Sequence, residues 1–284
     1  MVDLLGAVDV RELAARLDVV PTKKLGQNFV TDPNTIRRIV AAAKLDGSET
    51  VVEIGPGLGS LTLGLLEVAA RVEAVEIDPK MAAALEATIA KRAAGKDFTL
   101  VHQDALQIQQ LPYEPDALVA NLPYNISVPV LLHFLETFAS LRFGLVLVQA
   151  EVAHRLAAAP GSKVYGVPSA KLAWYAESAL AGNVSRNIFW PVPNVDSALC
   201  YFAKRAEPLG DEQLRLATFA VIDAAFSQRR KTLRQALASW AGSPDAAERL
   251  LRAAGIDPQA RGEALEIGQF VAIARADIAE KAAA

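Results

Sequence analysis

The chain has 284 residues, a hydrophobic fraction of 52% and a formal net charge of −3, a composition that excludes a disordered chain and allows one or two globular domains. No apolar run approaches the ~20 residues of a membrane-spanning helix, and the N-terminus lacks the pattern of a signal peptide. The single cysteine, Cys200, excludes an internal disulfide, and three scattered histidines indicate no metal site. We therefore expect a monomeric protein of the reducing cytoplasm that contacts no membrane.

The N-terminal part contains two helix start signals. An acidic pair spaced as in a capping box predicts a helix over residues 9–18. Asp32 as N-cap, followed by Pro33 at the first helical position, predicts a second helix that ends near Lys44. The segment 19–31 between them has no clear period and is predicted to be a loop.

Strand and helix patterns then alternate along the chain. The predicted strands are 50–54, 71–77, 98–102, 117–121 and 143–149, and the predicted helices between them are 60–69, 79–94 and 127–138. Strands that alternate with helices imply a parallel sheet, and right-handed crossovers place helices on both of its faces.

The alternation of strand and helix patterns stops after about residue 180. Strand-like residues 184–189 and 198–203 flank a proline-rich turn and favour an antiparallel edge on the sheet. From there on the pattern is helical, with predicted helices at 211–226, 230–241, 244–254 and 267–281. We expect an α/β, Rossmann-like domain over residues 1–205 and a small helical domain over residues 206–284.

A glycine-rich turn follows the first strand of the alternating region. It reads Glu53-Ile-Gly-Pro-Gly-Leu-Gly59, and such glycines let the backbone approach a ligand closely, although a plain tight turn has the same composition. A dinucleotide fingerprint would need its third glycine at position 60, which is Ser60. The turn therefore disfavours NAD.

Acidic residues follow the next two strands. Glu76 is suited to accept hydrogen bonds from a ribose diol, whereas Asp78 before Pro79 fits a helix N-cap. Asp104, after the third strand, is suited to accept from an adenine amino group. Three such features at consecutive strand ends predict an adenosine-containing cofactor without a pyrophosphate, and S-adenosylmethionine fits.

The fourth strand ends in Asn121-Leu-Pro123-Tyr124, a motif of the type that marks amino-group methyltransferases. Methylation of an exocyclic amine needs acceptors at its N–H groups, which localise the lone pair, and the Asn121 oxygen and a backbone carbonyl can supply them. Pro123 stiffens the turn, and Tyr124 offers a face on which a target base stacks. Phe189 is a second candidate for stacking, with a core aromatic beneath a turn as the alternative.

A basic run without acids stands in the C-terminal part. Its cations are Arg229, Arg230, Lys231 and Arg234, which we expect at the start of a helix with Arg230 and Arg234 on one face. A solvated helix face is the ordinary interpretation of such a run. Because the whole chain is acidic, RNA affinity would have to come from a local patch of this kind.

These motifs resemble the ribosomal RNA adenine dimethyltransferases that modify two adjacent adenosines near the 3′ end of small-subunit RNA. The resemblance extends from about Val10 to about Ala274. It is carried by the segments Lys24–Phe29, Glu53–Gly59, Val75–Asp78, Gln103–Ala105, Asn121–Ile126, Gln149–Val152, Ser162–Gly166, Phe189–Pro193 and Phe226–Arg234.

The resemblance implies an S-adenosylmethionine-dependent enzyme that dimethylates the N6 amino groups of two adjacent adenosines in the 3′-terminal hairpin of 16S rRNA, in a small-subunit precursor during ribosome biogenesis. It implies further that Asn28 and Val30 contact the cofactor's amino-acid end, that Gly55 contacts its methionine part, and that Asn121 lies at both cofactor and target amine. Glu76 and Asp104 keep the roles given above.

Three alternatives remain beside this interpretation. A sister family methylates large-subunit RNA, but the segments Ser162–Gly166 and Phe226–Arg234 resemble the small-subunit branch. A non-catalytic assembly factor on the same fold is disfavoured by the intact Asn-Leu-Pro-Tyr motif and by Glu76. A DNA amino-methyltransferase is disfavoured because residues 205–284 are too short for a separate target-recognition domain.

Overall fold

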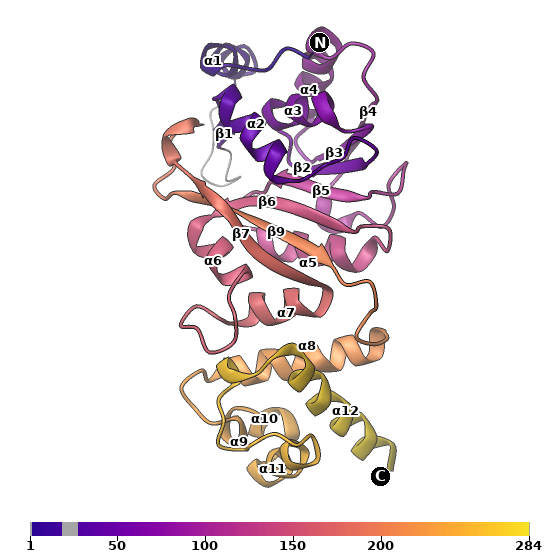
Figure 1. Cartoon of the computed structure of the whole chain (residues 1–284), viewed down its shortest axis with the longest axis vertical. Helices are drawn as coiled ribbons and strands as arrows, with labels where there is room; N and C mark the ends of the chain where they lie inside the picture. Colours follow the sequence, from indigo (N-terminus) through magenta and orange to yellow (C-terminus); the bar gives the residue numbers. More distant parts are fainter. Residues whose placement is uncertain (1, 19–27, 284) are drawn as a thin grey trace. The chain divides into compact units, whose positions relative to one another are not determined.

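The computed structural model describes residues 2–18 and 28–283, drawn in Figure 1. The chain divides into two compact units, unit 1 comprising Met1–His154 and Ala179–Lys204, and unit 2 comprising Arg155–Ser178 and Arg205–Ala284. No helix formed by the described residues is long and apolar enough to cross a membrane.

The sheet of unit 1 has seven strands in the order β4-β3-β2-β5-β6-β9-β7. Their bounds are β2 Thr50–Ile54, β3 Arg71–Glu76, β4 Phe98–His102, β5 Ala117–Asn121, β6 Phe143–Gln149, β7 Ala176–Val184 and β9 Ser197–Lys204. Strands β2 to β6 pair in parallel, and β9 pairs antiparallel with β6. The expected α/β fold is confirmed, and the inner strands are mostly apolar because helices cover both faces, with buried acids at Glu53, Glu73 and Glu76.

Helices α2, α3 and α4 lie on one side of the sheet and α5 lies on the other (Figure 1). The helices of this part are α1 Ala7–Arg16, α2 Pro33–Ala42, α3 Ser60–Val68, α4 Pro79–Arg92, α5 Ser127–Thr137 and α6 Ala150–Leu156. Asp32 caps α2 as predicted, because its carboxylate accepts from Thr35 N at 2.9 Å. Helix α1 begins two residues earlier than predicted, because Asp9 caps it by accepting from Gly6 N at 2.8 Å.

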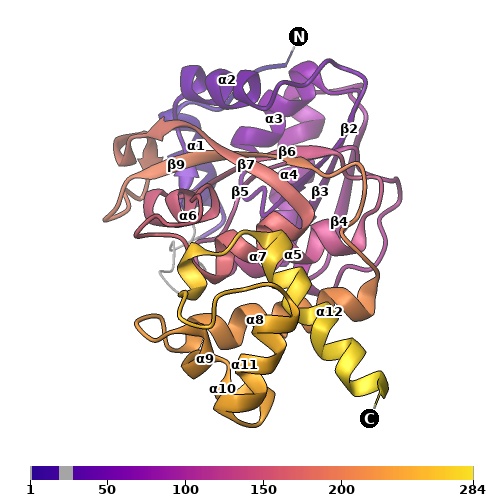
Figure 2. The same cartoon turned by 60° about the horizontal axis from the view of Figure 1, so that its bottom comes forward.

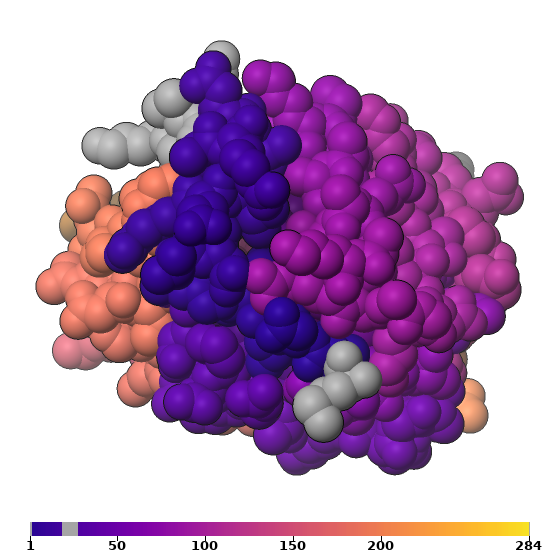
Figure 3. All heavy atoms as spheres, turned by 90° about the horizontal axis from the view of Figure 1, so that it is seen from above, coloured from indigo at the N-terminus to yellow at the C-terminus, as the bar shows by residue number. Residues whose placement is uncertain are grey.

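The predicted strand 184–189 is wrong. The long strand lies before it, as β7, and residues 186–188 form a 3₁₀ turn. Residues Phe189–Trp190 form β8, which pairs antiparallel with β1, Phe29–Val30, outside the main sheet. Within the predicted loop 19–31, Phe29–Val30 form strand β1. Residues 19–27 lie outside the described residues. Figure 3 shows the indigo N-terminal residues running between the magenta and the orange parts of unit 1.

Unit 2 is helical and is turned forward in Figure 2. Its helices are α7 Val167–Tyr175, α8 Glu212–Ser227, α9 Leu233–Ala236, α10 Ala238–Ala241, α11 Pro244–Ala253 and α12 Ile267–Ala283. The predicted helix 230–241 is two short helices that begin only at Leu233. Leu233 and Leu237 are fully buried, so their position in the core of this unit determines where the helical turns start.

The predicted domain 1–205 differs from unit 1 by residues 155–178 and by Arg205, which belong to unit 2. The physical reason is the contact of α7 with α8. Lys171 forms an ion pair with Asp223 at 2.8 Å, and Trp174 meets the edge of the Phe219 ring at a centroid distance of 6.3 Å. These contacts are non-local, so the local pattern of the segment does not show them.

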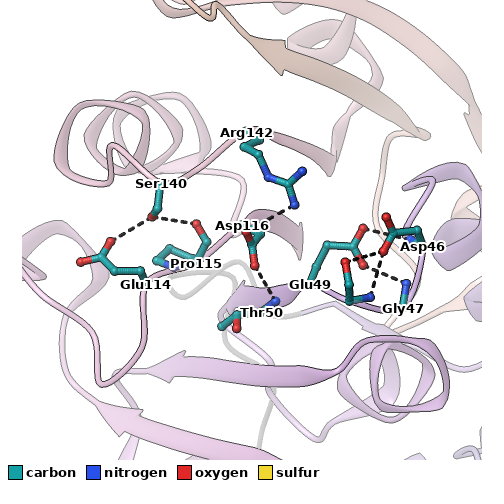
Figure 4. A network of polar contacts seen from close by, with 10 residues as sticks. Asp46, Gly47, Glu49, Thr50, Glu114, Pro115, Asp116, Ser140 and Arg142 are labelled. Atoms are coloured by element: carbon teal, nitrogen blue, oxygen red, sulfur yellow. Dashed lines mark hydrogen bonds and ion pairs between the residues drawn. The ribbon is translucent and has the colours of Figure 1, made fainter.

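A polar network joins the strand ends opposite the glycine-rich turn (Figure 4). Asp116, before β5, accepts from Thr50 N at the start of β2 at 2.9 Å and from Arg142, before β6, at 3.3 Å. Glu49 is 2% exposed, and its carboxylate accepts from the backbone N–H groups of Asp46 and Gly47. These bonds satisfy buried polar groups and fix the strands that carry the site at their other ends.

Candidate active site

The carboxyl ends of β2, β3, β4 and β5 enclose a cavity of about 290 Å³ in unit 1. Four carboxyl side chains line it, Glu53, Glu76, Asp78 and Asp104. Among the described lining residues there is no lysine, arginine or histidine. The cavity is therefore built for a ligand that carries positive charge and no phosphate.

The glycine-rich turn forms the floor of this cavity. Gly55 and Gly57 have φ angles of 65° and 56°, in the left-handed region that favours glycine. A Cβ atom on Gly57 would lie 2.8 Å from the ring of Phe29, so a larger residue would displace strand β1. Val30 of the same strand and Asn28 before it line the cavity.

Glu76, the last residue of β3, is held by the backbone. Its Oε2 accepts from Gly57 N at 3.1 Å and its Oε1 accepts from Asp78 N at 3.0 Å. Burial raises the pKa of Glu76, and these backbone hydrogen bonds partly oppose that effect. Each oxygen keeps a further lone pair for a ligand. Asp78 caps α4 by accepting from Lys80 N at 2.8 Å, the role expected from its place before a proline.

Asp104 follows β4 and is oriented in the same manner. Its Oδ1 accepts from Leu106 N at 3.0 Å at the start of a 3₁₀ turn, which leaves Oδ2 as an acceptor at the cavity. Glu76 and Asp104 therefore stand at neighbouring strand ends, on the edge of the sheet where folds of this type bind their ligands.

Asn121 ends β5 and lines the cavity beside Pro123. Its Nδ2 donates to the backbone oxygen of Asn28 at 3.0 Å. Because the amide nitrogen is engaged in that bond, the side-chain oxygen is the atom left to accept from a ligand. The contact thus presents Asn121 as a hydrogen-bond acceptor, which is what methylation of an amine requires.

Tyr124 also lines the cavity, and its hydroxyl is anchored. The Tyr124 and Ser197 hydroxyls share a hydrogen bond of 2.9 Å. Ser197 is fully buried at the start of β9. Burial raises the pKa of Tyr124, while the bond to Ser197 lowers it in part. The bond holds the ring at one position, and the sequence pattern offered no signal for the role of Ser197.

Phe189 is not brought into this cavity. It is 2% exposed, lies in the hydrophobic core of unit 1 and does not line the cavity. In strand β8 its backbone pairs with Val30, which turns the side chain into the core. The structure thus shows Phe189 as a core aromatic beneath a turn, and its role as a stacking face stays a prediction.

The four basic residues of the C-terminal run do not share one helix face. Arg229, Arg230 and Lys231 lie in the connection between α8 and α9, and only Arg234 is helical. Arg229 pairs with Glu263 at 3.0 Å. Arg234 pairs with Asp245 at 2.8 Å and with Glu248 at 2.7 Å. Within the described part of the chain, Arg230 and Lys231 are exposed and form no ion pair.

The cavity residues fit S-adenosylmethionine. Its adenosine would be held by Glu76 and Asp104, and its positive charge suits a cavity with four carboxyl groups. Two buried oxygens at the cavity have no hydrogen-bond partner among the described residues, Glu53 Oε2 and Ser60 Oγ. A ligand or a proton can satisfy them. The sequence shows Glu53 as an acid two residues before the first glycine of the turn, but this pattern predicted no role for it.

The fold and site define the class: a Rossmann-like, S-adenosylmethionine-dependent methyltransferase. The profile of the family described as "Ribosomal RNA adenine dimethylase" matches residues 21–277. The chain belongs to this family. It is therefore a ribosomal RNA methyltransferase that uses S-adenosylmethionine, as the resemblance implied.

Curated relatives are similar over nearly the full length. "Ribosomal RNA small subunit methyltransferase A" of Streptomyces coelicolor is 61% identical over 274 residues, which cover 95% of this chain and 96% of the relative. The protein of the same name from Leifsonia xyli subsp. xyli is 60% identical over 274 residues, covering 95% of this chain and 98% of the relative.

Two solved structures resemble the fold. The 23S rRNA methyltransferase ErmE has a TM-score of 0.65 and 26% identity, and the match covers 88% of this chain and 99% of that one. A dimethyladenosine transferase from Plasmodium falciparum has a TM-score of 0.73 at 22% identity, covering 86% of this chain and 95% of that one. The expected fold class is thereby confirmed.

Proposed function

We propose that this methyltransferase dimethylates the N6 amino groups of two adjacent adenosines in the 3′-terminal hairpin of 16S rRNA, within a small-subunit precursor in the cytoplasm. The names of the curated relatives, which are about 60% identical, support the small subunit as target. The observation that carries the chemistry is Asn121, whose engaged nitrogen leaves its oxygen as an acceptor at the cavity.

The residues assigned to the reaction act by positioning and electrostatics. The Asn121 oxygen and a backbone carbonyl of the Asn-Leu-Pro-Tyr turn accept from the two N–H groups of the adenine amine, which localises the nitrogen lone pair. Tyr124 stacks on the flipped base, and its bond to Ser197 keeps the ring in place. The cofactor supplies the methyl group, and the ammonium product then loses its proton to solvent, so no general base is needed.

The proposed cofactor contacts are Asn28, Val30, Gly55, Glu76, Asp104 and Asn121, all of which line the cavity. For RNA we propose Arg230 and Lys231 as phosphate contacts, since they carry exposed charge without an acidic partner among the described residues. Arg229 and Arg234 are neutralised by neighbouring carboxylates and serve mainly to hold unit 2 together. We propose that the protein acts as a monomer.

Mass spectrometry of ribosomal RNA tests the proposed target. A deletion strain should lack two N6,N6-dimethyladenosines in the 3′-terminal hairpin of its small-subunit RNA, and complementation with the intact gene should restore both. Complementation with Asn121→Ala should restore neither. Loss of methyl groups from large-subunit RNA in the deletion strain would instead assign the protein to the sister function.

A further inference from the structure

Glu53 is the one carboxyl of the described cavity lining that is both almost fully enclosed and without a bond to the backbone. It is 1% exposed, in strand β2 directly before the glycine-rich turn. Its Oε2 has no hydrogen-bond partner among the described residues. Glu76, by contrast, accepts two backbone hydrogen bonds. The orphaned oxygen indicates that Glu53 lacks the contacts that stabilise a buried carboxylate.

Among the residues that the structure describes, the groups around Glu53 add no positive charge. Strand β3 contributes Glu76, whose negative charge acts on Glu53 directly, and strand β5 contributes the neutral Asn121. Helix α3 contributes only the hydroxyls of Ser60 and Thr62. The Thr62 hydroxyl lowers the pKa of Glu53 in part, although it lies outside hydrogen-bonding geometry. The remaining charged groups of the cavity lining, Asp78 and Asp104, are acidic as well.

Burial first, and then repulsion from Glu76, raise the pKa of Glu53 to about 8. At neutral pH the carboxyl group is therefore mostly uncharged in the free protein. The cavity then holds one buried proton that an incoming cation can displace. This follows from geometry as well, because an enclosed, unpaired carboxylate beside a second carboxylate is strongly unfavourable.

We propose that cofactor binding is linked to a proton through Glu53, which is protonated in the free protein and releases its proton to solvent when the cationic S-adenosylmethionine enters the cavity. The ligand carries a sulfonium and an ammonium group against a single carboxylate, so its net charge is positive. It thereby supplies a counter-charge that the described residues do not provide around Glu53. The proposal rests on the assignment of this cavity to the cofactor.

The direction of the pH dependence follows from linkage. Binding of a cation lowers the pKa of Glu53, so protons are released at any pH between its bound-state and free-state pKa values. In that range the observed dissociation constant falls as pH rises, by up to tenfold per pH unit. Above about pH 8 the free protein has no proton left to release, and the affinity becomes constant.

Calorimetric titration with S-adenosylmethionine near neutral pH, in phosphate and in Tris buffer, tests the proposal. The two buffers differ in ionisation enthalpy, so the difference in binding heat counts the protons released. We expect a release of about one proton for the wild type. 5′-Methylthioadenosine carries the same adenosine without the charges and should release none.

Two variants locate the proton. Glu53→Gln keeps the shape of the side chain and should bind S-adenosylmethionine with no proton release. Glu73→Gln is the matched control, because Glu73 is equally buried, has a raised pKa and does not line the cavity, so this variant should keep the wild-type release. Thermal unfolding confirms that each variant is folded.

The possible outcomes distinguish the role of Glu53 from the assignment of the cofactor site. Binding heat without buffer dependence in the wild type, or an unchanged proton release in Glu53→Gln, would overturn the role of Glu53 and leave the cofactor site intact. Absence of any binding heat in the folded wild type would overturn the cofactor assignment itself. A release with 5′-methylthioadenosine equal to that with S-adenosylmethionine would show that the adenosine, and not the cation, displaces the proton.

Discussion

The side-chain nitrogen of Asn121 donates to the backbone oxygen of Asn28 across 93 positions of sequence, at 3.0 Å. This bond joins the end of strand β5 to the N-terminal segment before β1. It fixes the amide so that the oxygen is the acceptor left for a ligand. In the proposed reaction the N-terminal segment thus helps to orient Asn121 toward the amine substrate.

Replacing Asn121 should therefore affect the reaction more than binding. We expect Asn121→Ala to lower the rate of methyl transfer by about 10²-fold or more, the loss typical of a removed electrostatic contact at a reacting centre. The dissociation constants for the small-subunit particle and for S-adenosylmethionine should change much less. Single-turnover assays measure the rate of methyl transfer, and calorimetry measures the dissociation constants. A transfer rate within a few-fold of that of the wild type would contradict the role of Asn121.

Glu76→Ala should act mainly on the cofactor. The variant loses a charge-assisted contact and also leaves Gly57 N and Asp78 N without their acceptor. We expect a loss of roughly 2–3 kcal/mol in binding of S-adenosylmethionine. Calorimetry with the folded variant measures it, with Glu73→Gln as control in the same strand. An unchanged affinity would remove Glu76 from the proposed ribose contact.

In the proposed mechanism Ser197 acts through Tyr124 as a positioning residue. Ser197→Ala removes a hydrogen bond worth about 1 kcal/mol, so we expect kcat to fall about fivefold with the affinity for S-adenosylmethionine unchanged. Ser197→Thr keeps the hydroxyl and should recover most of the activity. Tyr124→Phe removes the same bond, so the two losses should not add in the double variant. Additive losses would show that the bond does not matter to catalysis.

We expect two different roles among the four basic residues: Arg230 and Lys231 contact RNA phosphates, whereas Arg229 and Arg234 stabilise unit 2. Replacing Arg230 and Lys231 together with Gln should weaken binding to the small-subunit particle and reduce the slope of log affinity against log salt by about 2. Arg234→Gln should instead lower the melting temperature, because it leaves Asp245 and Glu248 without their shared partner. Binding at several salt concentrations distinguishes them. An unchanged salt slope for the double variant, together with a reduced slope for Arg234→Gln, would contradict phosphate contacts by Arg230 and Lys231.

Stability should fall as pH rises toward 8. Burial raises the pKa of Glu73 to about 7, above its value of 4.5 in an unfolded chain, although its Oε1 accepts from Tyr113 N. A raised folded-state pKa means that the contribution is fully present below pH 4.5 and is lost as pH rises through about 7. Glu73→Gln cannot ionise, so over that pH range its free energy of unfolding should fall by roughly 2–3 kcal/mol less than that of the wild type. Denaturant unfolding between pH 5 and 8 measures the difference, and parallel curves would contradict it.

Local sequence determined the parallel half of the sheet and the acceptors at its edge. Strands β2 to β6 were predicted within a residue because their apolar runs are bounded by turn and cap signals, such as the glycine-rich turn after β2 and Asp78 after β3. Strand ends in such a sheet share one edge, so the positions of Glu76, Asp104 and Asn121 followed from their order in the chain. The family also followed from these local motifs.

Contacts between distant segments decided the rest. The pairing of β8 with β1 buried Phe189, the contact of α7 with α8 moved residues 155–178 into unit 2, and ion pairs with Asp245 and Glu248 neutralised Arg234. None of these partners is near in sequence, and a local pattern reports only a residue's own propensity. The environment of Glu53 is of the same kind: its identity is visible in the sequence, but its buried, unpaired state depends on the strands and helix that enclose it.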